Sequence, residues 1–170
     1  MLVRICKKYD IKLINLVRRQ EQVDILVEEG ADIVLDSSLD IFESKLKEII
    51  AEYKPTVFFD AIGGSFSSQV LSLMPDYSTM YVYGNLSGEA IIYDAKNLIF
   101  KGHNISNFYI VAWINSLSPE DKSKWFGSIV DDINSGGEMF GTKISKKFAL
   151  IDFEAAMEYA KEHASEGKVE

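Results

Sequence analysis

Short apolar runs alternate with helical apolar periods along the first half of the chain. The runs are rich in β-branched and aromatic residues and are mostly continuous, which is typical of strands buried on both faces of a parallel sheet. They predict four strands, over residues 13–17, 33–35, 56–59 and 80–83. The pattern therefore predicts successive strand–helix units.

Three helical stripes lie between and after these runs, with apolar residues at spacings of three and four. The stripes are Val23, Leu26 and Val27; Phe42, Leu46, Ile49, Ile50 and Tyr53; and Phe66, Val70, Leu71 and Met74. Strand–helix units in succession predict an α/β fold. We expect a Rossmann-like, doubly wound, mostly parallel sheet with helices on both faces.

The second half is less regular. It predicts a strand at Ala90–Tyr93, a short helix within residues 94–100 and a strand at Ile105–Ile110. Ser118 and Pro119, followed by acidic residues, predict the start of a helix. Its apolar face is expected to be Phe126, Ile129, Val130 and Ile133, and the last helix, capped by Asp152, is expected to bury Phe153, Ala156, Met157 and Ala160.

The two ends of the sequence differ from a complete Rossmann pattern. Helical spacing over residues 2–9 predicts that the chain opens with a helix, and no strand precedes it. The sequence contains neither GxGxxG nor a Walker loop, the turns that hold a pyrophosphate after a first strand. We therefore expect a sheet that lacks its first strand. Gly167, Lys168 and Val169 predict the start of a strand at the other end.

Composition and charge limit the classes of partner. The 170 residues predict one domain, and 26 acidic against 18 basic residues give a net charge of −8, so we expect no nucleic acid and no membrane partner. A single cysteine, Cys6, excludes an internal disulfide, and two separated histidines predict no zinc site. A reducing intracellular compartment, cytoplasmic or mitochondrial, is expected. Any targeting segment is expected upstream of Met1.

A pair of arginines follows the first predicted strand. Arg18 and Arg19 stand where a nicotinamide-binding fold contacts the adenosine ribose. An acid there would bind the 2′-hydroxyl, whereas guanidinium groups suit a 2′-phosphate. The pair favours NADPH over NADH. The alternative is a solvated charge pair before a helix.

Glycines follow two successive strands, at Gly63-Gly64 and at Gly84. They either admit a ligand at the carboxyl edge of the sheet or make tight turns. Asp60 is expected to serve a turn. Phe108 and Tyr109 either flank a cofactor ring or pack in the core.

Other reactive side chains receive no chemical role. Cys6 is expected to be an inert buried thiol, and Lys168 is a surface lysine unless an anion lies nearby. His103 is expected in a loop and His163 on an exposed helix. We therefore predict no catalytic residue and no metal ligand within the chain.

The order and spacing of seven segments resemble the cofactor domain of medium-chain dehydrogenase/reductases, in the zinc-free quinone oxidoreductase and 2-enoyl thioester reductase branch. The segments are Ile14–Arg19, Glu29–Asp32, Phe59–Gly64, Met80–Asn85, Leu98–Lys101, Asn107–Ile110 and Gly167–Val169. The family usually has two glycines at Gly84-Asn85 and Gly-Phe-Trp at Asn107-Phe108-Tyr109. Side-chain details at those positions therefore differ.

The resemblance implies roles for eleven cofactor-binding residues. Arg18, Arg19 and Gln20 would meet the 2′-phosphate end of NADPH. Tyr83, Gly84, Asn85 and Leu86 would line the nicotinamide side; Phe108, Tyr109 and Ile110 would supply backbone contacts, and Lys168 a late contact.

The resemblance also implies a missing part. Family members carry an N-terminal barrel-like domain, so residues 1–170 are interpreted as a partial NADP-binding domain that is inactive alone. The full-length protein would transfer hydride from NADPH to an activated C=C of a 2-enoyl thioester or to a quinone, with a small molecule as substrate. The alternative is a non-catalytic interaction or structural protein. Open edges at Leu13 and Thr56 predict a homo-oligomer or pairing with another chain, and the apolar edge at Ala90–Tyr93 is a further candidate for this pairing.

Overall fold

The computed structural model describes residues 1–163 and 165–170. Contacts divide the chain into two compact units, one made of residues 1–42 and 119–170 and the other of residues 43–118. All paired strands in both units run parallel, as predicted. The predicted parallel α/β architecture is therefore confirmed.

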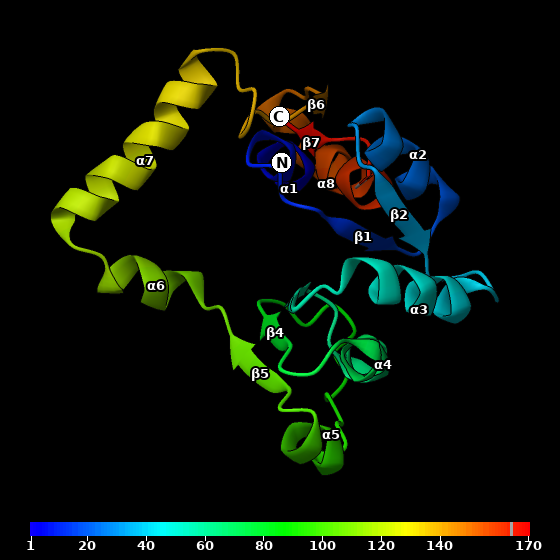
Figure 1. Cartoon of the computed structure of the whole chain (residues 1–170). Coiled ribbons are helices and arrows are strands. Elements are labelled where there is room, and N and C mark those ends of the chain that lie inside the picture. Colours follow the sequence, from blue (N-terminus) through cyan, green and yellow to red (C-terminus); the bar gives the residue numbers. More distant parts are fainter. Residues whose placement is uncertain (164) are drawn as a thin grey trace. The chain divides into compact units, whose positions relative to one another are not determined.

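Residues 43–118 form a three-stranded sheet with helices between its strands (Figure 1). The strand order is β3-β4-β5, which is also the order along the sequence. The elements are α3 (Phe42–Tyr53), β3 (Val57–Asp60), α4 (Gly64–Leu73), β4 (Thr79–Val82), α5 (Ala95–Phe100), β5 (Asn104–Asn107) and α6 (Ile110–Ser116). Helical connections between parallel neighbours are what this pairing requires.

The core of this unit joins α4 to the sheet. Met80 of β4 and Leu71 of α4 are fully buried, and Val70 and Met74 are nearly so. Strand residues alternate between the two faces of a sheet, so the neighbours of buried Met80 face the other way. On that other face Phe59 is 54% exposed, although its ring stacks on Tyr81 at a centroid distance of 5.9 Å.

The other unit contains two two-stranded sheets, β1-β2 and β6-β7. Its elements are α1 (Leu2–Lys8), β1 (Ile14–Val17), α2 (Gln20–Glu28), β2 (Ile33–Asp36), α7 (Pro119–Asn134), β6 (Ile144–Lys146), a 3-10 turn (Leu150–Asp152), α8 (Phe153–Glu162) and β7 (Lys168–Val169). The opening helix, the strand after it and the closing strand at residues 168–169 agree with prediction.

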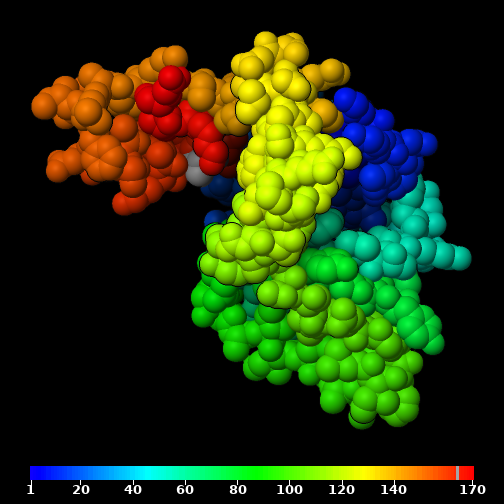
Figure 2. Space-filling view, turned by 90° about the vertical axis from the view of Figure 1, so that its left-hand side faces the viewer, coloured from blue at the N-terminus to red at the C-terminus, as the bar shows by residue number. Residues whose placement is uncertain are grey.

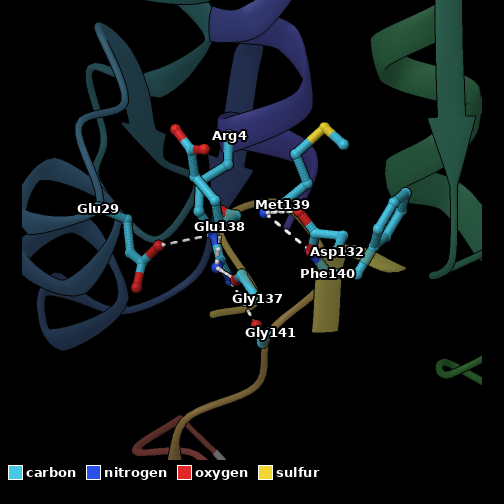
Figure 3. Close-up of polar contacts among 8 residues, drawn as sticks. All are labelled: Arg4, Glu29, Asp132, Gly137, Glu138, Met139, Phe140 and Gly141. Carbon is cyan, nitrogen blue, oxygen red and sulfur yellow. Dashed lines mark hydrogen bonds and ion pairs between the residues drawn. The ribbon is translucent and has the colours of Figure 1, made fainter. Parts of the chain in front are cut away.

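Arg4 joins α1 to a glycine-rich loop in this unit (Figure 3). Its guanidinium donates to the backbone carbonyl oxygens of Gly137 (3.3 Å), Glu138 (3.2 Å) and Gly141 (2.8 Å). Its Nε also lies 3.3 Å from a carboxylate oxygen of Glu29. One side chain therefore ties the first helix both to the loop after α7 and to the end of α2.

Burial differs from prediction in the two C-terminal helices. α7 begins where the Ser118 and Pro119 signal predicts, but Phe126, Val130 and Ile133 on its apolar face are exposed. Figure 2 shows this helix in yellow on the molecular surface. In α8, Phe153 is 60% exposed and Met157 is also exposed, so the predicted buried face is wrong. Periodicity defines an apolar face, whereas burial also needs a neighbouring element to cover it.

Two predicted strands in the second half require correction. Residues 90–93 form no strand, and Ile92 is 81% exposed. This segment is instead held by a hydrogen bond between the Tyr93 hydroxyl and Nδ1 of buried His103. The strand predicted at Ile105–Ile110 ends at Asn107, because the chain leaves the ladder to begin α6.

Candidate functional site

The carboxyl ends of β3, β4 and β5 form one continuous edge. The amide of Tyr83 donates to the carbonyl of Asp60 at 2.9 Å, and the amide of Leu86 donates to the carbonyl of Ala61 at 3.0 Å. The amide of Phe108 donates to the carbonyl of Val82 at 2.9 Å. The structure thus places two predicted groups, Tyr83–Leu86 and Phe108–Ile110, at the ends of neighbouring strands.

Asp60 organises the first turn of this edge. Its side chain is only 1% exposed, and its carboxylate accepts hydrogen bonds from the amides of Ile62 (3.0 Å) and Gly63 (3.1 Å). A carboxylate that bonds the backbone two and three residues later makes an Asx-type turn. The predicted turn role of Asp60 is confirmed.

The glycines at this edge let the two loops touch. A Cβ at Gly84 would lie 2.8 Å from the carbonyl oxygen of Ala61, and a Cβ at Gly63 would lie 2.8 Å from the side-chain oxygen of Asn85. Gly63 also has φ of 76°, a conformation that side chains disfavour. Close packing of the neighbouring loops requires a glycine at both positions, and the positive φ of Gly63 agrees with the tight-turn alternative there.

The aromatic residues of the edge are accessible. Tyr109 is 60% exposed, and Tyr83 and Phe108 are exposed as well. Phe108 packs its ring near Trp113, with centroids 6.2 Å apart. Tyr109 is the N-cap of α6, where its extended backbone ends the run from β5. Core packing, the alternative for Phe108 and Tyr109, is therefore wrong, and these rings are available to a ligand.

The basic group at the end of β1 lies in the other unit. Arg18 and Arg19 follow the strand directly, and Arg19 is the extended N-cap residue of α2. Both side chains are exposed, and within residues 1–163 and 165–170 neither guanidinium forms an ion pair. Gln20 donates its side-chain amide to the Asp24 carboxylate at 2.8 Å. Two permanent cations are thus open to an anion.

A hydrogen bond joins this basic group to the end of the chain. Nη2 of Arg19 donates to the hydroxyl of Ser165 at 3.1 Å, across 146 residues of sequence. Ser165 lies in the turn before β7, which carries the exposed Lys168. The backbone amide of Lys168 donates to the carbonyl of Lys143 at 2.8 Å. The Arg18–Gln20 group and Lys168 therefore belong to one compact unit, and the two aromatic groups belong to the other.

Sequence reasoning missed Ser165 and its surroundings. Glu166 accepts from Nδ1 of His163 at 2.6 Å and from the hydroxyl of Tyr159 at 3.2 Å. The rings of Tyr159 and His163 stack with centroids 4.1 Å apart. The hydrogen bond from His163 is the main reason that the pKa of Glu166 lies below its ordinary value. The only sequence signal was the small and polar composition of residues 163–167, which is typical of a turn.

The remaining reactive groups are Cys6, His103 and His163. Cys6 is buried, as predicted, and burial raises the pKa of its thiol, which disfavours the reactive thiolate. His103 lies in a loop as predicted, and its Nε2 donates to the carbonyl of Pro75 at 3.0 Å. His163 is the C-cap residue of α8 and is half-buried, a correction to the exposed helical position predicted.

The described part of the chain holds neither a metal-binding cluster nor a membrane-spanning helix. Residues 1–163 and 165–170 contain no group of three or more His, Cys, Asp or Glu side chains arranged to hold a metal ion. No helix in the same ranges is long and apolar enough to cross a membrane.

Comparison with known proteins finds one matching family model and several similar reductases. A family model described as zinc-binding dehydrogenase matches residues 1–123. The mitochondrial enoyl-(acyl-carrier-protein) reductase of Dictyostelium discoideum is 25% identical over 157 residues, which cover 89% of this chain and 44% of that protein. The chain spans about half the length of the relatives that it matches.

Solved structures share the fold at low sequence identity. A Mesorhizobium loti protein assigned as an NADPH:quinone reductase superposes with a TM-score of 0.80 and 23% identity, covering 99% of this chain and 48% of that one. The Etr1p/NADP/crotonyl-CoA complex gives a TM-score of 0.75 and 17% identity over 94% of this chain and 48% of that one. These likenesses establish the fold of the described chain.

Proposed function

Since the chain belongs to the zinc-binding dehydrogenase family, we propose that residues 1–170 are part of the NADPH-binding, Rossmann-like domain of a reductase. The observation that carries this proposal is the exposed pair Arg18 and Arg19 at the carboxyl end of β1, without an ion pair among the described residues. Their guanidinium groups stand out in a chain of net charge −8. An anion held at this position is held locally, against the overall field.

The donor set fits a ribose 2′-phosphate. Guanidinium groups bind phosphate through paired N–H donors, and they stay charged at every physiological pH. Arg18, Arg19 and Gln20 would hold this end of NADPH, and Lys168 would add a further cation. The named cofactor of the solved Etr1p complex, NADP, supports the choice.

The edge of the three-stranded sheet would serve the other end of the cofactor. Tyr83, Gly84, Asn85 and Leu86 would line the nicotinamide side, and backbone groups of Phe108, Tyr109 and Ile110 would contact it. The accessible rings of Tyr83 and Tyr109 are available for this role. Asp60 would keep the first loop in place, because its carboxylate is fully engaged with the backbone.

The proposed reaction belongs to the whole protein. When bound, NADPH would supply hydride to an activated C=C of a 2-enoyl thioester or to a quinone. Names of the relatives, enoyl reductase and quinone reductase, support this substrate class. They do not favour the non-catalytic alternative. This chain contributes cofactor binding, and no residue in it is proposed as the catalytic acid.

Comparing the two nicotinamide cofactors tests the proposal. We expect the purified chain to bind NADPH more tightly than NADH in calorimetric titrations. Arg19→Gln removes one charge-assisted hydrogen bond, worth about 1.5–3 kcal/mol, and should weaken NADPH binding about 10- to 100-fold without changing NADH binding. Lys124→Gln removes an exposed charge on α7 and is the matched control. Equal affinities, or no binding of either cofactor, would contradict the proposal.

We also propose that the chain pairs with another chain through a strand edge. Among the described residues, β3 pairs only with β4, and Val57 and Phe59 beside the open edge are exposed. Unpaired backbone groups at an apolar edge favour strand addition. Sedimentation should show a dimer or larger species that Phe59→Lys weakens, with Leu150→Lys, at a residue that is 90% exposed, as the control. A wild-type monomer would rule this out.

A further inference from the structure

The contact between Arg19 and Ser165 leaves the proton of the Ser165 hydroxyl unused. The Ser165 hydroxyl accepts from Nη2 of Arg19 at 3.1 Å. A hydroxyl accepts and also donates one hydrogen bond. Within residues 1–163 and 165–170, no acceptor for the Ser165 proton is present. The guanidinium of Arg19 likewise keeps N–H donors beyond the one used here, since it has five. Two neighbouring groups therefore present free donors at the end of β1.

The turn that carries Ser165 is fixed independently of Arg19. On one side, the Glu166 amide donates to the carbonyl of His163 at 3.0 Å, and the Glu166 carboxylate accepts from the His163 ring at 2.6 Å. On the other side, Gly167 has φ of 147°, and a Cβ there would lie 2.6 Å from the carbonyl of Lys143. The position of Ser165 thus follows from α8 and β6, so its hydroxyl is pre-positioned beside the arginine.

We propose that Ser165 is a specificity-determining residue that donates its hydroxyl proton to the same phosphate that Arg19 binds. The inference rests on the proposed function and adds a residue from the far end of the chain. Polar atoms 3.1 Å apart are close enough to contact two oxygens of one phosphate group. The Ser165 hydroxyl already lies beside Arg19 before a ligand binds. We expect it to favour a ligand with a ribose phosphate over one with a ribose hydroxyl. The ligand class is a nucleotide with a phosphate on the adenosine ribose.

Two small nucleotides isolate this contact from the rest of the cofactor. Adenosine 2′,5′-bisphosphate carries the ribose phosphate, and AMP lacks it. Calorimetric titration of the whole chain should show tighter binding of the bisphosphate. Ser165→Ala should weaken bisphosphate binding about 10-fold, the loss of one hydrogen bond to a charged group, and should leave AMP binding unchanged. Ser165→Thr keeps the hydroxyl and should restore the preference.

Two further variants separate specificity from a structural role. Ser165→Asp places a carboxylate beside Arg19 and should abolish the preference for the bisphosphate while AMP still binds. Ser128→Ala, on α7, removes a serine hydroxyl that donates to the carbonyl of Trp125 in its own helix at 2.8 Å, and should change neither affinity. Circular dichroism of each variant reports whether the fold is kept.

The outcomes separate the inference about Ser165 from the proposed function of NADPH binding. If the wild type prefers the bisphosphate and Arg19→Gln removes that preference, but Ser165→Ala behaves as the wild type, the inference about Ser165 is overturned and the proposed function stands. If Ser165→Ala weakens both nucleotides equally, Ser165 only supports the turn and the inference is again overturned. If the wild type shows no preference, both proposals fail.

Discussion

Removing the Asp60 carboxylate provides the sharpest test of how the carboxyl edge is built. Asp60→Ala deletes the acceptor for the amides of Ile62 and Gly63. A buried donor without a partner costs about 1–3 kcal/mol. Gly63 is buried, whereas Ile62 is partly exposed and its amide can turn to water, so only one full penalty applies. We expect a loss of about 2 kcal/mol in the free energy of unfolding.

Local hydrogen exchange measures this change where it occurs. Amide protection at Ile62 and Gly63 should fall in Asp60→Ala, and the urea midpoint of the chain should fall with it. Asp60→Asn keeps one side-chain oxygen as acceptor and should lose about half as much stability. Asp76→Asn changes an exposed aspartate and is the control. The reasoning is refuted if Asp60→Ala leaves both the Gly63 protection and the urea midpoint at wild-type values.

Two other predictions concern the unit formed by residues 1–42 and 119–170. Arg4→Ala removes three hydrogen bonds to the loop at residues 137–141. It should raise protease cleavage in that loop, and Arg4→Lys should do so partly, because one ammonium cannot reproduce the fork. The pKa of Glu166 is below its ordinary value of 4.5, mainly because of the hydrogen bond from His163. A carboxyl group whose pKa is lowered by folding stabilises the fold at pH values above 4.5. This stabilisation is lost as the pH falls through the pKa of the folded state. Acidification below about pH 4.5 should therefore reduce amide protection at residue 163 and at residues 165–168 in the wild type. Glu166→Gln should lack that step, and identical profiles would contradict the assignment.

Local sequence patterns were sufficient to predict the elements that depend on residue type or on neighbouring positions in the sequence. Continuous apolar runs rich in β-branched and aromatic residues predicted β1 to β4, because these residue types favour strands. The expected burial on both faces is wrong for β3, where Val57 and Phe59 are exposed. The helix at Pro119 follows from a start signal within three residues. The turn role of Asp60 followed from its position directly after a strand. The helix start and the Asp60 turn depend on bonds between residues close in sequence, and the strand positions depend on residue types that favour an extended backbone.

Patterns failed where a neighbouring element had to supply a partner. Residues 90–93 are as apolar as a strand, yet no adjacent strand pairs with them among the described residues. The apolar faces of α7 and α8 are real, but Phe126 and Phe153 remain exposed. A single-chain periodicity describes which residues share a face and carries no information about what covers that face.

By itself, the sequence determined the parallel α/β architecture and the positions of the arginines, glycines and aromatic residues at strand ends. Only the tertiary structure decided that Arg19 meets Ser165, 146 residues away, and that Arg4 holds a loop more than 130 residues away. Contacts over such separations depend on how whole elements pack, and no local propensity encodes them. In the candidate phosphate site, the arginines were therefore predicted from the sequence, and the serine beside them was found only in the structure.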